Sequence, residues 1–307
     1  MPRFLSLRPG LRLSLLLLAG LVLALPSRAE PVPLGKGKVT VDVGVPLEVF
    51  TYKPANYAGG PLVLVFHGVN RNAEDYRNFA LTLGERFGVL VAAPYFDLER
   101  FPNDAYQRGG VMKAGRPQPR EQWTFALVPK IVAALRAAEG RPDLPYYFLG
   151  HSAGGQFLVR MIALAGPLGA ERVVAANPGS HLFPTRAARY GYGFGGLPEE
   201  WTTDEAIRRY LAAPLTLYLG TGDRNPQDKN LERGEEAMRQ GPYRHARGLN
   251  CFAFATNITT QLGWTLGWRL VETPDIGHDA AKMFAAPEVG QALFGAAGAP
   301  RDGSAAQ

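Results

Sequence analysis

Cysteine is almost absent from this sequence, since Cys251 is the single thiol among 307 residues. One cysteine cannot form an intramolecular disulfide, so the hydrophobic core has to hold the fold together without covalent crosslinks. A chain of this length can bury enough apolar surface to do so. We expect Cys251 to be a small buried hydrophobic residue rather than a nucleophile.

A strong excess of one charge is also missing. The formal net charge is +6, but four arginines lie in residues 1–29, and the rest of the chain has 29 basic and 27 acidic residues. A protein that binds nucleic acid through its phosphates needs a large basic surface. The composition therefore predicts no nucleic-acid partner.

No apolar run is long enough to span a membrane. The longest, Leu13–Leu25, has about 13 residues, whereas a membrane-spanning helix needs ~20. Three arginines precede this run and the small-x-small triplet Ser27–Ala29 follows it, which is the pattern of a Sec signal peptide. We expect residues 1–29 to be that signal, with an uncleaved membrane anchor as the alternative. The Ala, Arg, Leu and Gly bias is typical of bacteria, so we expect a periplasmic or secreted protein with no membrane attachment after cleavage.

Short β-rich runs alternate with longer helical patterns over residues 30–294. Two runs with alternating polarity, 39–43 and 46–52, predict an antiparallel hairpin. Continuous apolar runs predict strands that are covered on both faces, at residues 61–66, 89–93, 146–149, 172–176, 215–219 and 268–271. Helices are expected near residues 73–87, 120–139, 153–165, 231–240, 246–262 and 279–294. This alternation predicts an α/β domain with a mostly parallel, twisted central sheet and helices on both faces.

Three segments do not show a regular pattern. Residues 95–119 are rich in Gly and Pro, and residues 178–205 are rich in Gly and aromatic side chains. Both follow expected strand ends, where ligands bind in open α/β sheets. Residues 178–205 are therefore expected to be either a lid or substrate wall, or an ordinary surface loop. The small and polar tail, 295–307, is expected to be disordered.

The most informative motif is the pentapeptide Gly150-His-Ser-Ala-Gly154, which follows an expected strand and precedes an expected helix. A G-x-S-x-G sequence in that context is typical of a nucleophile elbow, a sharp turn that presents its serine at the edge of the sheet. The two glycines give the turn the space it needs. Ser152 is thus the candidate nucleophile; the alternative is a Gly-rich turn in which Ser152 only caps the helix.

A serine nucleophile needs a base and an orienting acid, which follow the elbow in the order acid, then histidine. His278 comes just after the last expected strand and is the candidate base. His245 lies in a basic helical stretch and is expected to be solvated surface. Asp223 ends a Gly-rich turn after a strand and is the candidate acid. Asp275 and Asp279, which flank His278, are the fallback acids.

The oxyanion hole needs two backbone donors. One is expected to be the N–H of Ala153, the residue after the nucleophile, and the other the N–H of Val69, in the loop after the strand at residues 61–66. His67 precedes the elbow, so we expect it to shape this loop rather than act as base. His67, His181 and Trp201 are also the candidate substrate contacts.

Together these residues resemble the α/β-hydrolase superfamily, and within it the secreted polyhydroxybutyrate depolymerase and feruloyl esterase-like branch of bacterial proteins. The resembling stretches are Val65–Tyr76, Gly150–Gly155, Leu219–Asn225 and Gly277–Asp279. Members of this branch often carry a cysteine in the oxyanion loop, where this chain has Val69.

The resemblance implies hydrolysis of a small-molecule or oligomeric carboxylic ester through a Ser-His-Asp triad and an acyl-enzyme, without a metal or organic cofactor. Two alternatives remain. The same triad also serves peptidases and amidases, and a non-catalytic binding protein can be built on the same scaffold.

Overall fold

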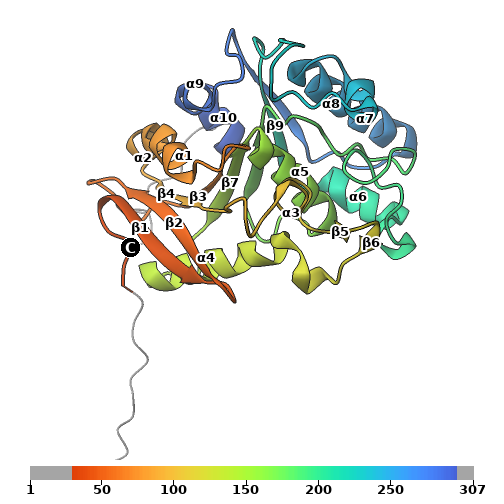
Figure 1. Ribbon diagram of the computed structural model, residues 1–307. Helices are drawn as coiled ribbons and strands as arrows, with labels where there is room; N and C mark the ends of the chain where they lie inside the picture. Colours follow the sequence, from red (N-terminus) through yellow and green to blue (C-terminus); the bar gives the residue numbers. More distant parts are fainter. Residues whose placement is uncertain (1–29, 296–307) are drawn as a thin grey trace, which may run out of the picture.

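The computed structural model describes residues 30–295, so the expected signal peptide and nearly all of the expected tail lie outside the described part. An eight-stranded sheet forms its centre (Figure 1), in the order β1-β2-β4-β3-β7-β8-β9-β10. The strands are β1 (Gly35–Asp42), β2 (Pro46–Lys53), β3 (Leu62–Phe66), β4 (Leu90–Pro94), β7 (Tyr146–His151), β8 (Arg172–Ala176), β9 (Leu215–Gly220) and β10 (Arg269–Thr273).

Parallel pairing dominates this sheet. The strands from β4 to β10 in that order run parallel, and β1 and β2 extend the sheet as an antiparallel hairpin. The prediction of a mostly parallel sheet with an N-terminal hairpin is confirmed. Since parallel strands have their carboxyl ends at one edge, the loops after β3, β7, β8, β9 and β10 gather there.

Two hydrophobic layers cover the sheet, and β3 shows why. All its residues are buried, and successive side chains point to opposite faces. Leu62, Leu64 and Phe66 join one core cluster, whereas Val63 and Val65 join the other. An uninterrupted apolar run is therefore required of a strand in this position.

Helices lie on both faces, as predicted (Figure 1). One face is covered by α1 (Ala73–Phe79), α2 (Leu81–Phe87), α9 (Ala280–Ala285) and α10 (Val289–Phe294). The other is covered by α4 (Val128–Glu139), α5 (Ala153–Leu164), α6 (Asp204–Ala212) and α8 (Arg244–Leu262). Two short helices, α3 (Asn103–Gln107) and α7 (Glu235–Gln240), pack against α5 and α8 respectively.

Several predicted helices have different limits. The helix expected at 120–139 begins only at Val128, after two 3-10 turns. Pro129 explains the start, because a proline fits the first helical turn, where its missing N–H needs no intrahelical acceptor. The helix expected at 73–87 is divided at Ala80. The one expected at 279–294 is divided into α9 and α10 around Pro287.

The sequence reading missed α6 and the structure within residues 95–119. Thr203 caps α6 by accepting the N–H of Ala206. This capping residue was included in the irregular segment 178–205, so the helix after it was not predicted. Residues 95–119 contain α3 and a small hairpin of β5 (Met112–Lys113) and β6 (Arg116–Pro117).

The segment at residues 178–205 is fastened to the body of the domain. Two of its aromatic side chains, Tyr192 and Phe194, are buried, and Phe194 belongs to the core. Arg160 of α5 donates to the carbonyl of Gly191, which ties the segment to that helix. Over residues 30–295, no helix combines the length and apolarity that crossing a membrane would require.

Candidate active site

Three residues from the carboxyl edge of the sheet meet in one hydrogen-bonded line. Ser152 follows β7, Asp223 follows β9 and His278 follows β10. The Oγ of Ser152 lies 2.9 Å from Nε2 of His278, and the Nδ1 of His278 lies 2.7 Å from Oδ2 of Asp223. The three side chains named from the sequence are therefore brought together.

Ser152 occupies the strained turn that an elbow requires. Its φ is 57° and its ψ is −115°, a backbone conformation that residues with a side chain rarely adopt. The turn is also very tight. A Cβ added to Gly150 would lie 2.5 Å from the carbonyl carbon of Gly154, and one added to Gly154 would lie 2.1 Å from the oxygen of Phe66. Both elbow glycines are thus sterically required.

The fallback acids do not contact His278. Asp279 accepts the N–H of Lys282 and caps α9. Asp275 is exposed and donates its own N–H to Thr221. Asp223, by contrast, is only 2% exposed and makes its hydrogen bond to His278 from the interior.

A buried arginine holds the second oxygen of Asp223. Arg244, the first residue of α8, is 1% exposed and places Nη1 3.4 Å from Oδ1 of Asp223. Its Nη2 lies 3.0 Å from Oδ1 of Asp228. Because Arg244 takes Oδ1, the other oxygen, Oδ2, is directed at His278.

The expectation that His245, in the same basic stretch as Arg244, is solvated surface is wrong. His245 is buried, and its Nε2 lies 2.6 Å from Oε1 of Glu272. Its backbone N–H donates to the carbonyl of Asp223. Arg244 and His245 face inward because acidic side chains after β9 and in β10 offer them hydrogen-bond acceptors or partners.

A second histidine lies against the candidate base. The rings of His151 and His278 are 4.5 Å apart between centroids and tilted by 35°. Burial, followed by the charges of His278 and Arg244, lowers the pKa of His151 well below its usual value, so this ring stays neutral. The Tyr76 hydroxyl and Nδ1 of His151 share a hydrogen bond at 3.2 Å. His151 therefore packs as an uncharged support under His278.

Asn177 joins three loops of the sheet edge. It follows β8 and has a positive φ of 41°. Its Oδ1 accepts the N–H of Gly220 at 2.8 Å, and its Nδ2 donates to the carbonyl of Gly277 at 3.2 Å. Because Gly220 leads to Asp223 and Gly277 precedes His278, Asn177 fixes the two loops that carry them.

Hydrogen bonds from buried side chains hold the loop after β3 (residues 67–71, the β3 loop) in place. Nε2 of His67 accepts the N–H of Phe96, and its Nδ1–H donates to the carbonyl of Gly68. Burial lowers the pKa of His67 to about 4, which keeps Nε2 available as an acceptor near neutral pH. The Tyr106 hydroxyl donates to the carbonyl of His67 at 2.8 Å. His67 is fully buried, so it shapes this loop and offers no surface to a substrate.

The guanidinium of Arg71 ties the end of the β3 loop to the segment that follows β4. It has a positive φ of 59° and donates to the carbonyls of Phe96 and Phe101 at 3.1 and 2.8 Å. Its guanidinium also lies 4.4 Å above the Tyr106 ring. Half-buried Val69 stands within this braced loop, and Gly154 packs against the loop's first carbonyls. The loop with Val69 and the helix start with Ala153 are thus adjacent.

The other two candidate substrate contacts, His181 and Trp201, are in different surroundings. His181 is fully buried, so its ring is not accessible from solvent. Trp201 stacks edge-on against Trp123, beside Arg120, which donates to the carbonyl of Leu164 at the last residue of α5. Since the 12 residues of α5 extend about 18 Å, Trp201 is at the opposite end of that helix from Ser152.

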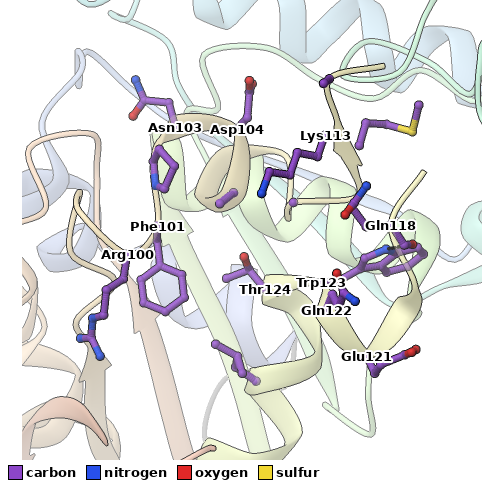
Figure 2. Close-up of a pocket in the computed structure, with 16 residues that line it drawn as sticks. Arg100, Phe101, Asn103, Asp104, Lys113, Gln118, Glu121, Gln122, Trp123 and Thr124 are labelled. Atoms are coloured by element: carbon purple, nitrogen blue, oxygen red, sulfur yellow. Dashed lines mark hydrogen bonds between the residues drawn. The ribbon is translucent and has the colours of Figure 1, made fainter. Parts of the chain in front are cut away.

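A cleft of about 650 Å³ opens at α3, and neither the β3 loop nor Ser152, Asp223 or His278 is among the residues that line it (Figure 2). Asn103 and Asp104 of α3 line it together with Lys113 and Gln118 from the segment that follows. Arg71 donates to Oδ1 of Asn103 at 3.2 Å, so the cleft and the β3 loop share a structural support. Within residues 30–295, no group of three or more His, Cys, Asp or Glu side chains is arranged to hold a metal ion.

Sequence reasoning missed the residues that support the site. These are Arg71, Tyr106, His151, Asn177 and Arg244, none of which contributes an atom to the Ser-His-Asp line. Only His151 and Asn177 carried a signal, since each directly follows or ends a strand at the carboxyl edge. The others are in a loop (Arg71), in the short helix α3 (Tyr106) and at a helix start (Arg244), where a sequence pattern gives no direction for a side chain.

Two solved structures are similar to this chain over most of its length. Poly(aspartic acid) hydrolase-1 from Sphingomonas sp. KT-1 is 34% identical, with a TM-score of 0.76, over 83% of this chain and 96% of the other. LpqC, a poly(3-hydroxybutyrate) depolymerase from Bordetella parapertussis, is 35% identical, with a TM-score of 0.75, over 81% of this chain and 86% of the other. No protein-family model matches the sequence, and no curated protein matches it. With this identity, coverage and sheet topology, the chain belongs to the α/β-hydrolases, in the branch of the poly(3-hydroxybutyrate) depolymerases.

Proposed function

We propose that the protein is a serine hydrolase of carboxylic esters, with Ser152 as nucleophile, His278 as base and Asp223 as the orienting acid. Oγ of Ser152 attacks the ester carbonyl carbon while its proton passes to Nε2 of His278. Asp223 accepts the Nδ1–H of the imidazolium and stabilises its charge. The imidazolium then protonates the leaving alcohol as the carbon–oxygen bond breaks, which leaves an acyl group on Ser152.

The carbonyl oxygen becomes negatively charged in the tetrahedral intermediate and needs donors. We assign this role to the N–H groups of Val69 and Ala153, one on the braced β3 loop and one at the start of α5. Each such donor typically contributes about 3 kcal/mol of transition-state stabilisation. In the second half-reaction His278 removes a proton from water, the hydroxide attacks the acyl carbon, and Ser152 regains its proton from the imidazolium.

One observation carries this proposal: the continuous hydrogen-bonded line from Ser152 through His278 to buried Asp223, which starts at a strained elbow. The ester-hydrolysing neighbour, a poly(3-hydroxybutyrate) depolymerase, supports the reaction class. For the substrate we propose a small-molecule or oligomeric ester.

Amide hydrolysis is the second candidate. The neighbour named poly(aspartic acid) hydrolase acts on a polymer whose residues are joined by amide bonds, and it is as similar to this chain as the depolymerase is. The triad chemistry is the same, but the leaving amine depends more strongly on protonation by the imidazolium.

The proposal is tested by treating the purified protein with a fluorophosphonate and locating the adduct by mass spectrometry. A single adduct on Ser152 is expected, because only an activated serine reacts with this probe. A panel of paired ester and amide substrates with the same acyl group then ranks the two reactions. A native protein that takes up no probe would instead be a binding protein on a hydrolase scaffold.

Asp223→Asn is expected to lower kcat about 10⁴-fold while the fold is retained, as for the same change in serine proteases. The amide has the shape of the carboxylate, but it donates to Nδ1 and so favours the imidazole tautomer that cannot accept the Ser152 proton. Steady-state kinetics with circular dichroism measures both effects.

Asp275→Asn is the matched control for that variant. It removes a carboxylate from the same His278 loop, at an exposed residue with a φ of 58°, which asparagine tolerates. Activity close to that of the wild type is expected. The reverse ranking, with Asp275 essential and Asp223 dispensable, would transfer the orienting role to the His278 loop.

A further inference from the structure

We propose that the ion pair of Arg244 and Asp228, which contacts Asp223, sets the pH range in which His278 acts as a base. This inference rests on the proposed function. Arg244 and Asp228 are then positioning residues, since neither touches Ser152 or His278. They act through Oδ1 of Asp223, the oxygen that His278 does not use.

The geometry makes Arg244 a fixed charge. Its side chain is 1% exposed, and its two terminal nitrogens lie 3.4 Å from Asp223 and 3.0 Å from Asp228. The backbone N–H of the next residue, His245, donates to the carbonyl of Asp223, so the start of α8 is held against the acid. A guanidinium does not lose its proton at any pH that the protein survives. Arg244 therefore presents its charge to Asp223 throughout the working range.

Asp228, the other acid that pairs with Arg244, is more exposed to solvent than Asp223. Its side chain is 25% exposed, and it also accepts the N–H of Asn230 at 2.8 Å. Hydrogen bonds from Arg244 and from Asn230 outweigh partial burial and lower the pKa of Asp228, with a further contribution from His278. It is thus an anion in the working range, and it offsets part of the charge of Arg244.

These charges act on His278 with opposite signs. Arg244 opposes the imidazolium, because it neutralises part of the negative charge of Asp223. Asp228 favours the imidazolium, because it neutralises part of the positive charge of Arg244. Charges of this kind, several ångströms apart at a partly buried site, shift a proton equilibrium by about one pH unit.

Other groups near His278 do not account for the same effect. His151 is neutral against the His278 ring, and Asp279 is occupied with the start of α9 and with Lys282 at 3.8 Å. Arg247, one turn further along α8, donates to backbone carbonyls and has its pKa lowered mainly by burial. These groups stay unchanged in the variants described below, so a shift is attributable to the altered residue.

The experiment compares the pH dependence of kcat/KM for the wild type, Arg244→Gln, Arg244→Lys and Asp228→Asn. Activity falls on the acid side when His278 becomes protonated. In Arg244→Gln this midpoint should move up by about one pH unit, because the charge of Asp223 is no longer offset. In Asp228→Asn it should move down by roughly half a unit, because Arg244 loses its partner. Arg244→Lys keeps the cation and should restore most of the wild-type midpoint.

Arg239→Gln is the control for a general change of charge. It removes a cation from an exposed pair with Glu235 on α7, where solvent screens the interaction. No shift is expected. A merely structural role of Arg244 would lower kcat or stability without moving the midpoint, and Asp228→Asn, at a partly exposed residue, keeps the test open if Arg244→Gln does not fold.

A second measurement separates this inference from the proposed reaction. In the Ser152→Ala background, the ring signals of ¹⁵N-labelled His278 are titrated by NMR with and without Asp228→Asn and Arg244→Gln. His278 midpoints that move in opposite directions in the two variants support this role of the Arg244–Asp228 pair, whether or not an ester is turned over. Midpoints that stay fixed, or that move together, overturn it, whereas a wild-type protein without hydrolase activity overturns only the proposed function.

Discussion

Ser152→Ala is expected to lower kcat by about 10⁶ while the free energy of unfolding stays within about 1 kcal/mol of the wild type. The loss is large because no other group can form the acyl-enzyme. The structural effect is small because Oγ makes one hydrogen bond, to Nε2 of His278, and the variant loses only this bond.

Kinetics and urea unfolding of the same preparation measure the two quantities. The urea midpoints of the two proteins should differ by no more than a change of about 1 kcal/mol in unfolding free energy implies, and the variant should take up no fluorophosphonate. Turnover within tenfold of the wild type would show that Ser152 is not the nucleophile, and the elbow would then be only a tight strand-to-helix turn.

His278→Ala is expected to be as damaging as Ser152→Ala, at about 10⁶ in kcat, because the members of a triad work as a unit. Without the imidazole, the Ser152 hydroxyl keeps its proton and is a poor nucleophile. For the same reason the double variant should be little slower than either single one. Effects that multiplied instead, with the double variant far slower than both, would mean that the two residues act in separate steps.

His245→Ala is the control that separates a catalytic histidine from a structural one. His245 is buried beside Glu272 and its loss leaves a cavity, so a lower urea midpoint is expected. The protein that remains folded should keep most of its turnover number. An inactive but stable His245→Ala variant would require a new assignment of the base.

The sheet and the hydrogen-bonded line from Ser152 to Asp223 were predictable because each has a strong local signal. The strands at residues 61–66 and 172–176 are short, mostly apolar runs rich in β-branched side chains, which is typical of buried strands. Ser152 is marked by two obligatory glycines, and Asp223 and His278 each follow a strand by a few residues. Parallel pairing then brings these ends to one edge, so chain order was enough to group them.

The supporting residues could not be predicted for the opposite reason. Charged side chains are normally exposed, and the basic stretch around Arg244 and His245 was therefore assigned to the surface. Its burial depends on Asp223 and Glu272, which come from other parts of the chain and are only close in the folded protein. Similarly, Arg71 is buried because its guanidinium finds three acceptors in residues 96–103. Such tertiary compensation leaves no local periodicity.

The place of β10 at the end of the sheet has a consequence for how the enzyme would lose activity. β10 pairs with β9 alone, and it carries the loop that delivers His278. Edge elements with one neighbour open at lower free energy than the central strands, so partial opening can occur in molecules that are otherwise native. Detachment of this single strand would separate the base from its serine while the rest of the sheet stayed intact. Activity would then be lost at a lower temperature or denaturant concentration than the global fold. The activity of the protein would measure whether β10 is paired with β9 rather than whether the whole domain is folded.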